Sequence, residues 1–131
     1  MGKKQIIEEA KAYLERSHEA LESAKILHKE KRWNDSISRA YYAAFYAVNA
    51  ALLVSGDTSR SHRGVKTLLG LKIKEGLFTP DLGRAFNSLS QQREAADYSV
   101  FTFLNADDAT NTIEQAEKII KRMEQFITSL L

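Results

Sequence analysis

Residues 34–54 read NDSISRAYYAAFYAVNAALLV, and this stretch decides the fold class. Apolar side chains recur along it at spacings of three and four, which places them on one face of an α-helix. These are Ile37, Ala40, Tyr41, Ala44, Phe45, Val48, Ala51 and Leu52. A second stripe with the same spacing consists of Arg39, Tyr42, Tyr46, Asn49 and Leu53. Because both stripes are poor in charge, we expect this helix to lie at the centre of a bundle or to bury one face against another chain.

The ends of this helix can be placed from single residues. Asn34 or Asp35 is expected to cap the N-terminus, because either side chain accepts hydrogen bonds from free backbone N–H groups. Gly56 is expected to stop the helix, since glycine readily takes the left-handed conformation that ends many helices. The next helix should start near Ser59 or Ser61.

Four other segments show helical periodicity or helix-start signals. Gly76 ends one of them, and Thr79 followed by Pro80 is a strong N-cap and first residue for the next. Asn105, followed by Asp107 and Asp108, is expected to begin the last helix. The predicted helices cover about 3–31, 59 or 61 to 75, 79 to between 97 and 101, and 105–131. Residues 100–104 favour a strand, but no partner strand is visible.

Composition supports an all-α fold. The chain has 131 residues with one proline, so we predict one domain over residues 1–131, an up-and-down bundle of four to five helices. There is no cysteine, which excludes disulfides and cysteine nucleophiles and fits the cytoplasm. The net charge of +2 is too balanced to predict nucleic-acid binding by itself. The charged N-terminus lacks a signal peptide, and no stretch is apolar enough for a membrane span.

Histidines offer few options for chemistry. His18 and His28 are spaced for neither a metal site nor a catalytic pair, and we read them as surface or boundary residues. His62 stands between Arg60 and Arg63 at a predicted helix start, where free N–H groups and positive charge favour an anion. The alternative there is capping by a serine with solvated basic side chains. We expect no metal and no cofactor.

Two further groups of residues have a functional and a structural interpretation. The stripe with Arg39, Tyr42 and Tyr46 can stack a base and bind a phosphate, or it can pack as the seam of a dimer. Arg93 falls in the apolar phase of its helix, with Asp97 one turn later. Because a buried arginine needs a partner, this pair is either a functional site or a structural ion pair.

Three motifs follow one another along the chain: SRAYYAAFYA at 38–47, SHRGV at 61–65, and Arg93 followed by Ala96, Asp97 and Tyr98. In this order they resemble the HEPN domain family, in particular its small stand-alone prokaryotic members. The resemblance implies a bundle of four or five helices that usually dimerises. Many members are metal-independent endoribonucleases with an Arg-x(4–6)-His motif, and many are toxins encoded beside a small nucleotidyltransferase. Others bind nucleotides or act as non-catalytic partners.

The sequence departs from the family's catalytic motif. No arginine has a histidine five to seven positions after it, and Asp97 stands near the place where the histidine after Arg93 would be. We therefore expect a homodimeric binding partner of a nucleotidyltransferase-like protein that binds a nucleotide or RNA. Its expected ligand-binding residues are Arg39, Tyr42, Tyr46, His62, Arg63, Arg93, Asp97 and Tyr98. The alternatives are a ribonuclease toxin that uses Arg93 with His62, and a purely structural helical dimer.

Overall fold

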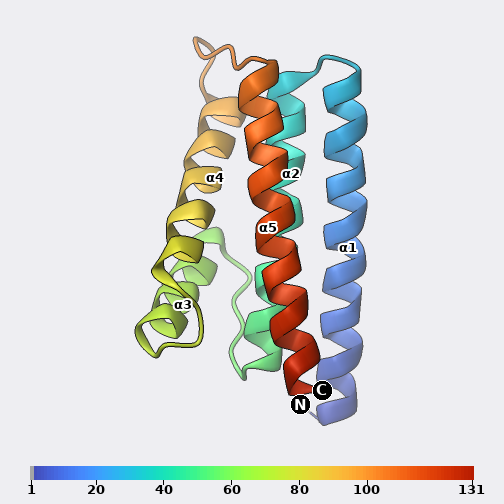
Figure 1. Ribbon diagram of the computed structural model, residues 1–131, viewed down its shortest axis with the longest axis vertical. Helices are drawn as coiled ribbons and strands as arrows, with labels where there is room; N and C mark the ends of the chain where they lie inside the picture. The colour runs from blue at the N-terminus through green and yellow to red at the C-terminus, as the bar shows by residue number, and fades with distance from the viewer. Residues whose placement is uncertain (1) are drawn as a thin grey trace.

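The computed structural model describes residues 2–131 and has five α-helices (Figure 1). They are α1 (Lys3–Lys29), α2 (Trp33–Val54), α3 (His62–Lys74), α4 (Pro80–Tyr98) and α5 (Ala106–Leu130). No strand occurs among these residues. The long helices α1, α2, α4 and α5 alternate in direction along the bundle (Figure 1). The predicted all-α bundle is therefore confirmed.

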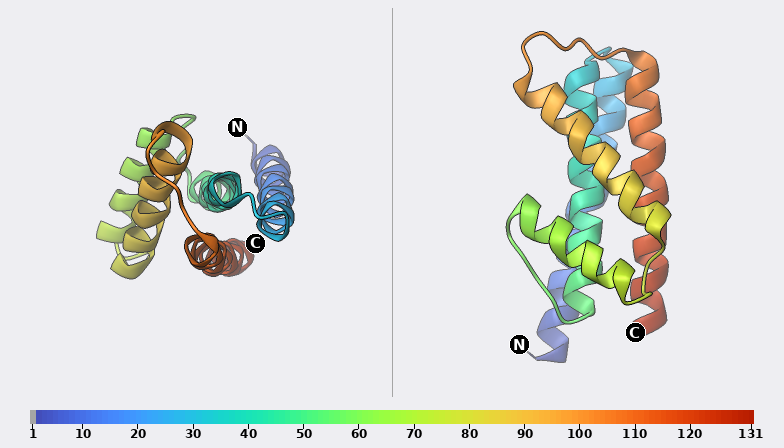
Figure 2. Two further views of the ribbon diagram at one scale, coloured as in Figure 1. Left: turned by 90° about the horizontal axis from the view of Figure 1, so that it is seen from above. Right: turned by 90° about the vertical axis from the view of Figure 1, so that its left-hand side faces the viewer.

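Helix α2 lies at the centre of the molecule, as its two uncharged stripes predict. Seen along the bundle, α1, α5 and the α3–α4 pair surround it (Figure 2, left), and α2 contacts each of these helices. Helices α3 and α4 cross it obliquely (Figure 2, right). Because α2 is enclosed in this way, its side chains can reach a ligand only where the neighbouring helices leave them exposed.

Small side chains bring α1 and α2 close together. Ser17 and Ala24 on α1 are completely buried, and so are Ser36 and Ala43 on α2. The Ser17 hydroxyl donates a 2.6 Å hydrogen bond to the Ala43 carbonyl, and the Ser36 hydroxyl donates one of 2.7 Å to the Ala24 carbonyl. These bonds satisfy both buried hydroxyls and fix the register of the two helices.

Three predicted helix starts are found. Ser61 caps α3 by accepting a 2.9 Å hydrogen bond from a backbone N–H of the first turn. Asn105 and Asp108 form a reciprocal capping box at the start of α5. Thr79 and Pro80 occupy the N-cap and first positions of α4, although the threonine side chain makes no capping bond.

Glycines follow α2 and α3, as predicted. Gly56 has φ of 100° and Gly76 has φ of 88°, both in the left-handed region. A residue with a Cβ is strained in this conformation, so glycine allows the chain to leave each helix in a tight turn.

The predicted cap of α2 is wrong. The helix starts at Trp33, so Asn34 lies inside its first turn. The Asn34 amide donates to the carbonyls of Ala96 (3.4 Å) and Thr102 (3.2 Å), and its oxygen accepts from the N–H of Leu104 at 3.2 Å. The side chain therefore ties down the connection between α4 and α5 instead of capping its own helix.

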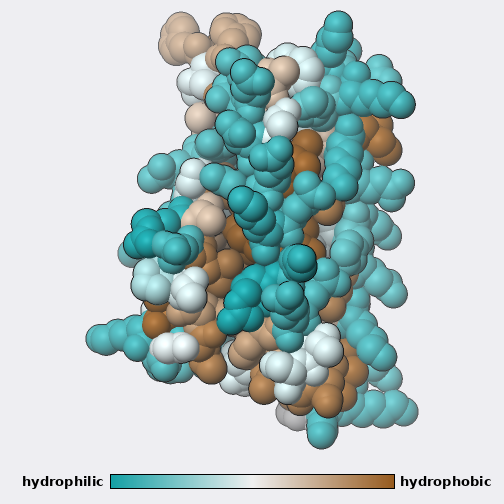
Figure 3. Space-filling model, in the orientation of Figure 1, coloured by the Kyte–Doolittle hydropathy of each residue, from teal (hydrophilic) through white to brown (hydrophobic). Residues whose placement is uncertain are grey.

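The segment between α4 and α5 carries two highly exposed apolar side chains. The β-prone stretch at 100–104 forms no strand, and Phe101 and Phe103 are 91% and 89% exposed. Apolar atoms project from this corner of the surface (Figure 3). In the part of the chain that the structure describes, no helix is both long and apolar enough to cross a membrane.

The α1–α2 contact leads to a stability prediction. Ala24→Leu should lower the free energy of unfolding by about 1–3 kcal/mol, because the added carbons must enter a contact that holds the Ser36 hydrogen bond. Urea denaturation followed by circular dichroism measures the change. Ala12→Leu, at an exposed position of α1, is the matched control and should have little effect. Equal midpoints for the two variants would contradict the tight packing described here.

Candidate functional site

An aromatic cluster forms where α2 meets the start of α3. It consists of Tyr41, Tyr42 and Phe45 from α2 and His62, the first residue of α3. The Tyr41 hydroxyl lies 2.8 Å from His62 Nδ1. The imidazole centroid lies 4.6 Å from the Phe45 ring and 5.6 Å from the Tyr42 ring. The Ser61 cap and the Tyr41 hydrogen bond together hold His62 against α2.

Arg93 enters the same region from α4. Its side chain is almost fully buried, and its guanidinium carbon lies 5.0 Å from the centre of the Tyr41 ring and 5.6 Å from that of Tyr98. One terminal nitrogen donates a 3.4 Å hydrogen bond to the Tyr98 hydroxyl. The predicted ion pair with Asp97 is present but long, at 3.7 Å. Arg93 Nε is buried without a hydrogen-bond partner, so the guanidinium retains an unused donor.

Burial shifts the pKa values of Tyr41 and His62, the two side chains that share a hydrogen bond. Burial raises the pKa of Tyr41 to about 12, against the opposing positive charge of Arg93. Burial also lowers the pKa of His62, and the positive charge of Arg93 lowers it further. The imidazole is therefore neutral at pH 7, and one of its ring nitrogens can accept a proton.

Arg39 flanks the aromatic cluster on α2. Its guanidinium carbon lies 4.7 Å from the centre of the Tyr42 ring, and its side chain is half-buried. Since the Tyr42 ring contacts both Tyr41 and His62, the two arginines are linked through aromatic rings. The structure thus brings Arg39, Tyr42, His62, Arg93, Asp97 and Tyr98 into one connected set.

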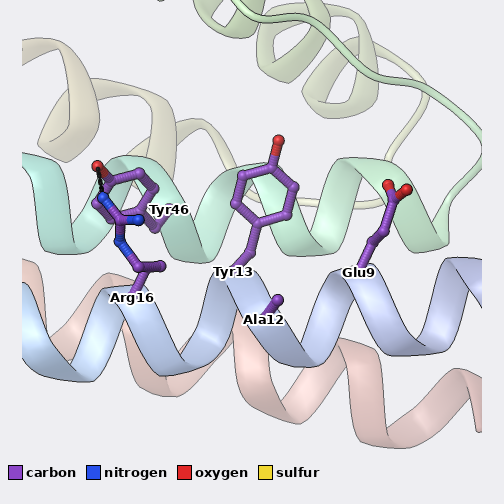
Figure 4. A pocket seen from close by; sticks show the side chains of 5 residues that line it. All are labelled: Glu9, Ala12, Tyr13, Arg16 and Tyr46. Carbon is purple, nitrogen blue, oxygen red and sulfur yellow. Dashed lines mark hydrogen bonds between the residues drawn. The ribbon is translucent and has the colours of Figure 1, made fainter.

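Two predicted ligand-binding residues lie apart from this set. Arg63 is exposed, in keeping with a solvated charge beside the Ser61 cap. Tyr46 touches Tyr42, with ring centroids 6.2 Å apart, but it faces α1. There it lines a pocket with α1 residues that the sequence patterns did not single out, among them Arg16 (Figure 4). Only helix packing brings these residues to Tyr46, so spacing along the chain could not reveal them.

The other two histidines belong neither to the aromatic cluster around His62 nor to the pocket at Tyr46. His18 is exposed and His28 half-buried, and they contact Glu124 at 3.2 Å and Thr110 at 2.8 Å. Both contacts join α1 to α5. Over residues 2–131, no group of three or more histidines or acids is arranged to hold a metal ion.

The burial of His62 leads to a pH prediction. Its pKa is lower in the folded protein than the ordinary 6.5, so the unfolded chain binds a proton more readily as pH falls. The stability present above pH 6.5 is therefore lost progressively on acidification. His62→Gln cannot titrate and should flatten the slope of unfolding free energy between about pH 7.5 and 5.5. Denaturation at several pH values measures this slope, and a variant with the wild-type slope would contradict the assignment.

Comparisons with known proteins agree on the family. The HEPN domain model matches residues 10–129. The chain is 36% identical over 125 residues to "Putative toxin MJ0605" of Methanocaldococcus jannaschii, covering 95% of this chain and 87% of that protein. It is 31% identical over 116 residues to a UPF0332 protein of Thermotoga maritima, covering 88% of each. The crystal structure of TT1696 from Thermus thermophilus shares the fold, with a TM-score of 0.76 at 19% identity over 93% of this chain and 98% of that one. Fold, motifs and matches together show that this chain belongs to the HEPN domain family.

Proposed function

We propose that this protein is the binding component of a toxin–antitoxin type system. In this proposal a dimer binds a nucleotide or an RNA phosphate beside α2 and pairs with a nucleotidyltransferase-like protein. The observation that carries the proposal is the convergence of Arg39, His62 and Arg93 around shared aromatic rings. The toxin name of the Methanocaldococcus relative supports the functional class.

The connected set contains the groups that a nucleotide needs. Arg39 is half-buried over Tyr42, so part of its guanidinium can face a phosphate while the ring orients it. Tyr98 is 74% exposed and offers a face on which a base can stack. The guanidinium carbon of Arg93 lies 5.6 Å from the centre of this ring, and its buried Nε has no hydrogen-bond partner, so it remains a donor for an anion bound here.

The absence of the usual ribonuclease motif favours binding over catalysis. No arginine has a histidine at the family's catalytic spacing, and Asp97, near that place, contacts Arg93. A carboxylate in this position adds negative charge where a cleavage reaction develops negative charge on the phosphate, which opposes catalysis.

One observation favours a ribonuclease as the second candidate. His62 and Arg93 both contact Tyr41, although they come from different helices. A neutral imidazole with a lowered pKa can accept a proton from a ribose hydroxyl, and a nearby guanidinium can stabilise the developing anion. In this alternative His62 replaces the histidine that the motif lacks.

Binding to single-stranded RNA and to nucleotides tests the first proposal. Arg39→Ala and Arg93→Lys should each weaken binding about tenfold or more, since each removes hydrogen bonds from a charged donor. Fluorescence anisotropy and ligand-induced thermal stabilisation provide the readouts. Arg84→Ala, an exposed arginine on α4, is the matched control and should bind like the wild type. If no nucleotide or RNA binds the wild type, the purely structural dimer becomes the better description.

Partner binding is a separate prediction. Co-expression with a nucleotidyltransferase-like protein encoded by a neighbouring gene should yield a complex that survives size-exclusion chromatography. Light scattering on the isolated protein should give the mass of a dimer. A monomer that forms no complex would contradict this part of the proposal.

Cleavage assays decide between binding and catalysis. We expect the purified protein to leave RNA intact and its induction not to arrest growth. Cleavage by the wild type that is lost in both His62→Ala and Arg93→Lys would instead establish the ribonuclease alternative. The Arg84→Ala variant, which changes an exposed arginine outside the proposed site, is again the control.

A further inference from the structure

A pocket lies between α1 and α2, away from Arg93. Its volume is about 310 Å³, and its lining consists of Glu9, Ala12, Tyr13, Arg16 and Tyr46. Figure 4 shows the Arg16 and Tyr46 side chains together at one end of the row and the Glu9 carboxylate at the other, with Tyr13 between them. A volume at the lower end of the usual range for ligand pockets suits one planar group rather than an extended small molecule.

The lining combines ring faces with a positive charge. The Arg16 guanidinium carbon lies 5.3 Å from the centre of the Tyr46 ring, and Arg16 donates a 3.4 Å hydrogen bond to the Tyr46 hydroxyl. The Tyr13 and Tyr46 rings are 6.5 Å apart and tilted by 31°. Tyrosine rings stack on any nucleobase, while arginine binds the phosphate that follows it. At the far end, the Glu9 carboxylate can accept a hydrogen bond from a base N–H, and it disfavours a phosphate there.

Contacts between aromatic rings connect the pocket to the site beside Arg93. The Tyr46 ring lies 6.2 Å from the Tyr42 ring, which in turn contacts Arg39 and His62. Rings and guanidinium groups thus follow one another from α1 across α2 towards α4. Successive aromatic and basic side chains of this kind form the path that a single-stranded nucleic acid takes over a protein.

We propose that the Tyr13–Arg16–Tyr46 pocket is a nucleobase-binding subsite for single-stranded RNA whose phosphate is held at the Arg39 and Arg93 site. The inference rests on the proposed function and extends it, because it defines the path of the RNA over the protein surface, from α1 across α2 towards α4. The polar rim of Arg16 and Glu9 fits a base with its phosphodiester. An interface between two copies would take both charged groups out of water, a desolvation penalty that pairing between the copies offsets only in part.

Anisotropy with a labelled single-stranded RNA of about 12 nucleotides tests the subsite. Tyr46→Ala should weaken binding at least about fivefold, whereas Tyr46→Phe keeps the ring and should bind like the wild type. Arg16→Ala should also weaken binding and lower its salt dependence. Lys11→Ala removes the same charge from another face of α1 and is the matched control. Circular dichroism melting confirms that each variant is folded before its affinity is interpreted.

The outcomes separate this inference from the proposed function. If Arg39→Ala weakens binding while Tyr46→Ala and Arg16→Ala do not, the subsite is overturned and the proposed function stands. If only the two pocket variants weaken binding, the pocket binds RNA without the Arg39 and Arg93 site, and this result overturns the proposed function. If Tyr46→Ala turns a dimer into a monomer by light scattering, the pocket is a contact between copies and the subsite is overturned. A wild type that binds no RNA overturns the subsite, and one that binds neither RNA nor a nucleotide overturns both.

Discussion

The structure depends on the enclosure of α2. A helix that packs against four neighbours has little contact with water, so each buried polar side chain on it needs a partner within the protein. Asn49 donates to the carbonyl of Phe45 one turn back, and Ser36 donates to α1. Tyr41 cannot reach its own backbone, so its hydroxyl is paired with His62. The position of the candidate site therefore follows from satisfying one buried hydroxyl.

Arg93 is the second buried group that the bundle must accommodate. Tyrosine rings and a distant carboxylate partly replace the water that its guanidinium gives up. The replacement is incomplete, since Nε has no partner. Native proteins leave few buried donors unused, and such donors often occur where a ligand completes the hydrogen bonding. The incomplete solvation of Arg93 is thus a structural argument for an anion in the HEPN bundle of this protein.

Sequence patterns predicted the fold well because helix periodicity and caps are local. The caps at Ser61 and Asn105 involve residues within one turn, and both are found. Asn34 has the same chemistry, but its amide satisfies a loop some sixty to seventy residues away, which no local pattern encodes. The α1 pocket was missed for the same reason. Tyr13 reads as part of an apolar stripe, and only the packing of α1 on α2 shows that its ring shares a pocket with Tyr46.

The balanced net charge conceals a local imbalance. The positive charges of Arg93 and Lys66 act on one neutral histidine, His62, against the negative charge of Glu94, so protonation of this histidine adds a third positive charge to the region. In the free protein this repulsion adds to the effect of burial and holds the histidine neutral. In the proposed site, an RNA phosphodiester bound between these groups would offset the repulsion, so it would raise the pKa of His62 and the histidine would take up a proton on binding. By linkage, such a phosphodiester would bind more tightly as pH falls, while the unliganded bundle becomes less stable. If the proposed function holds, we therefore expect acidification to affect folding and binding in opposite directions through a single side chain.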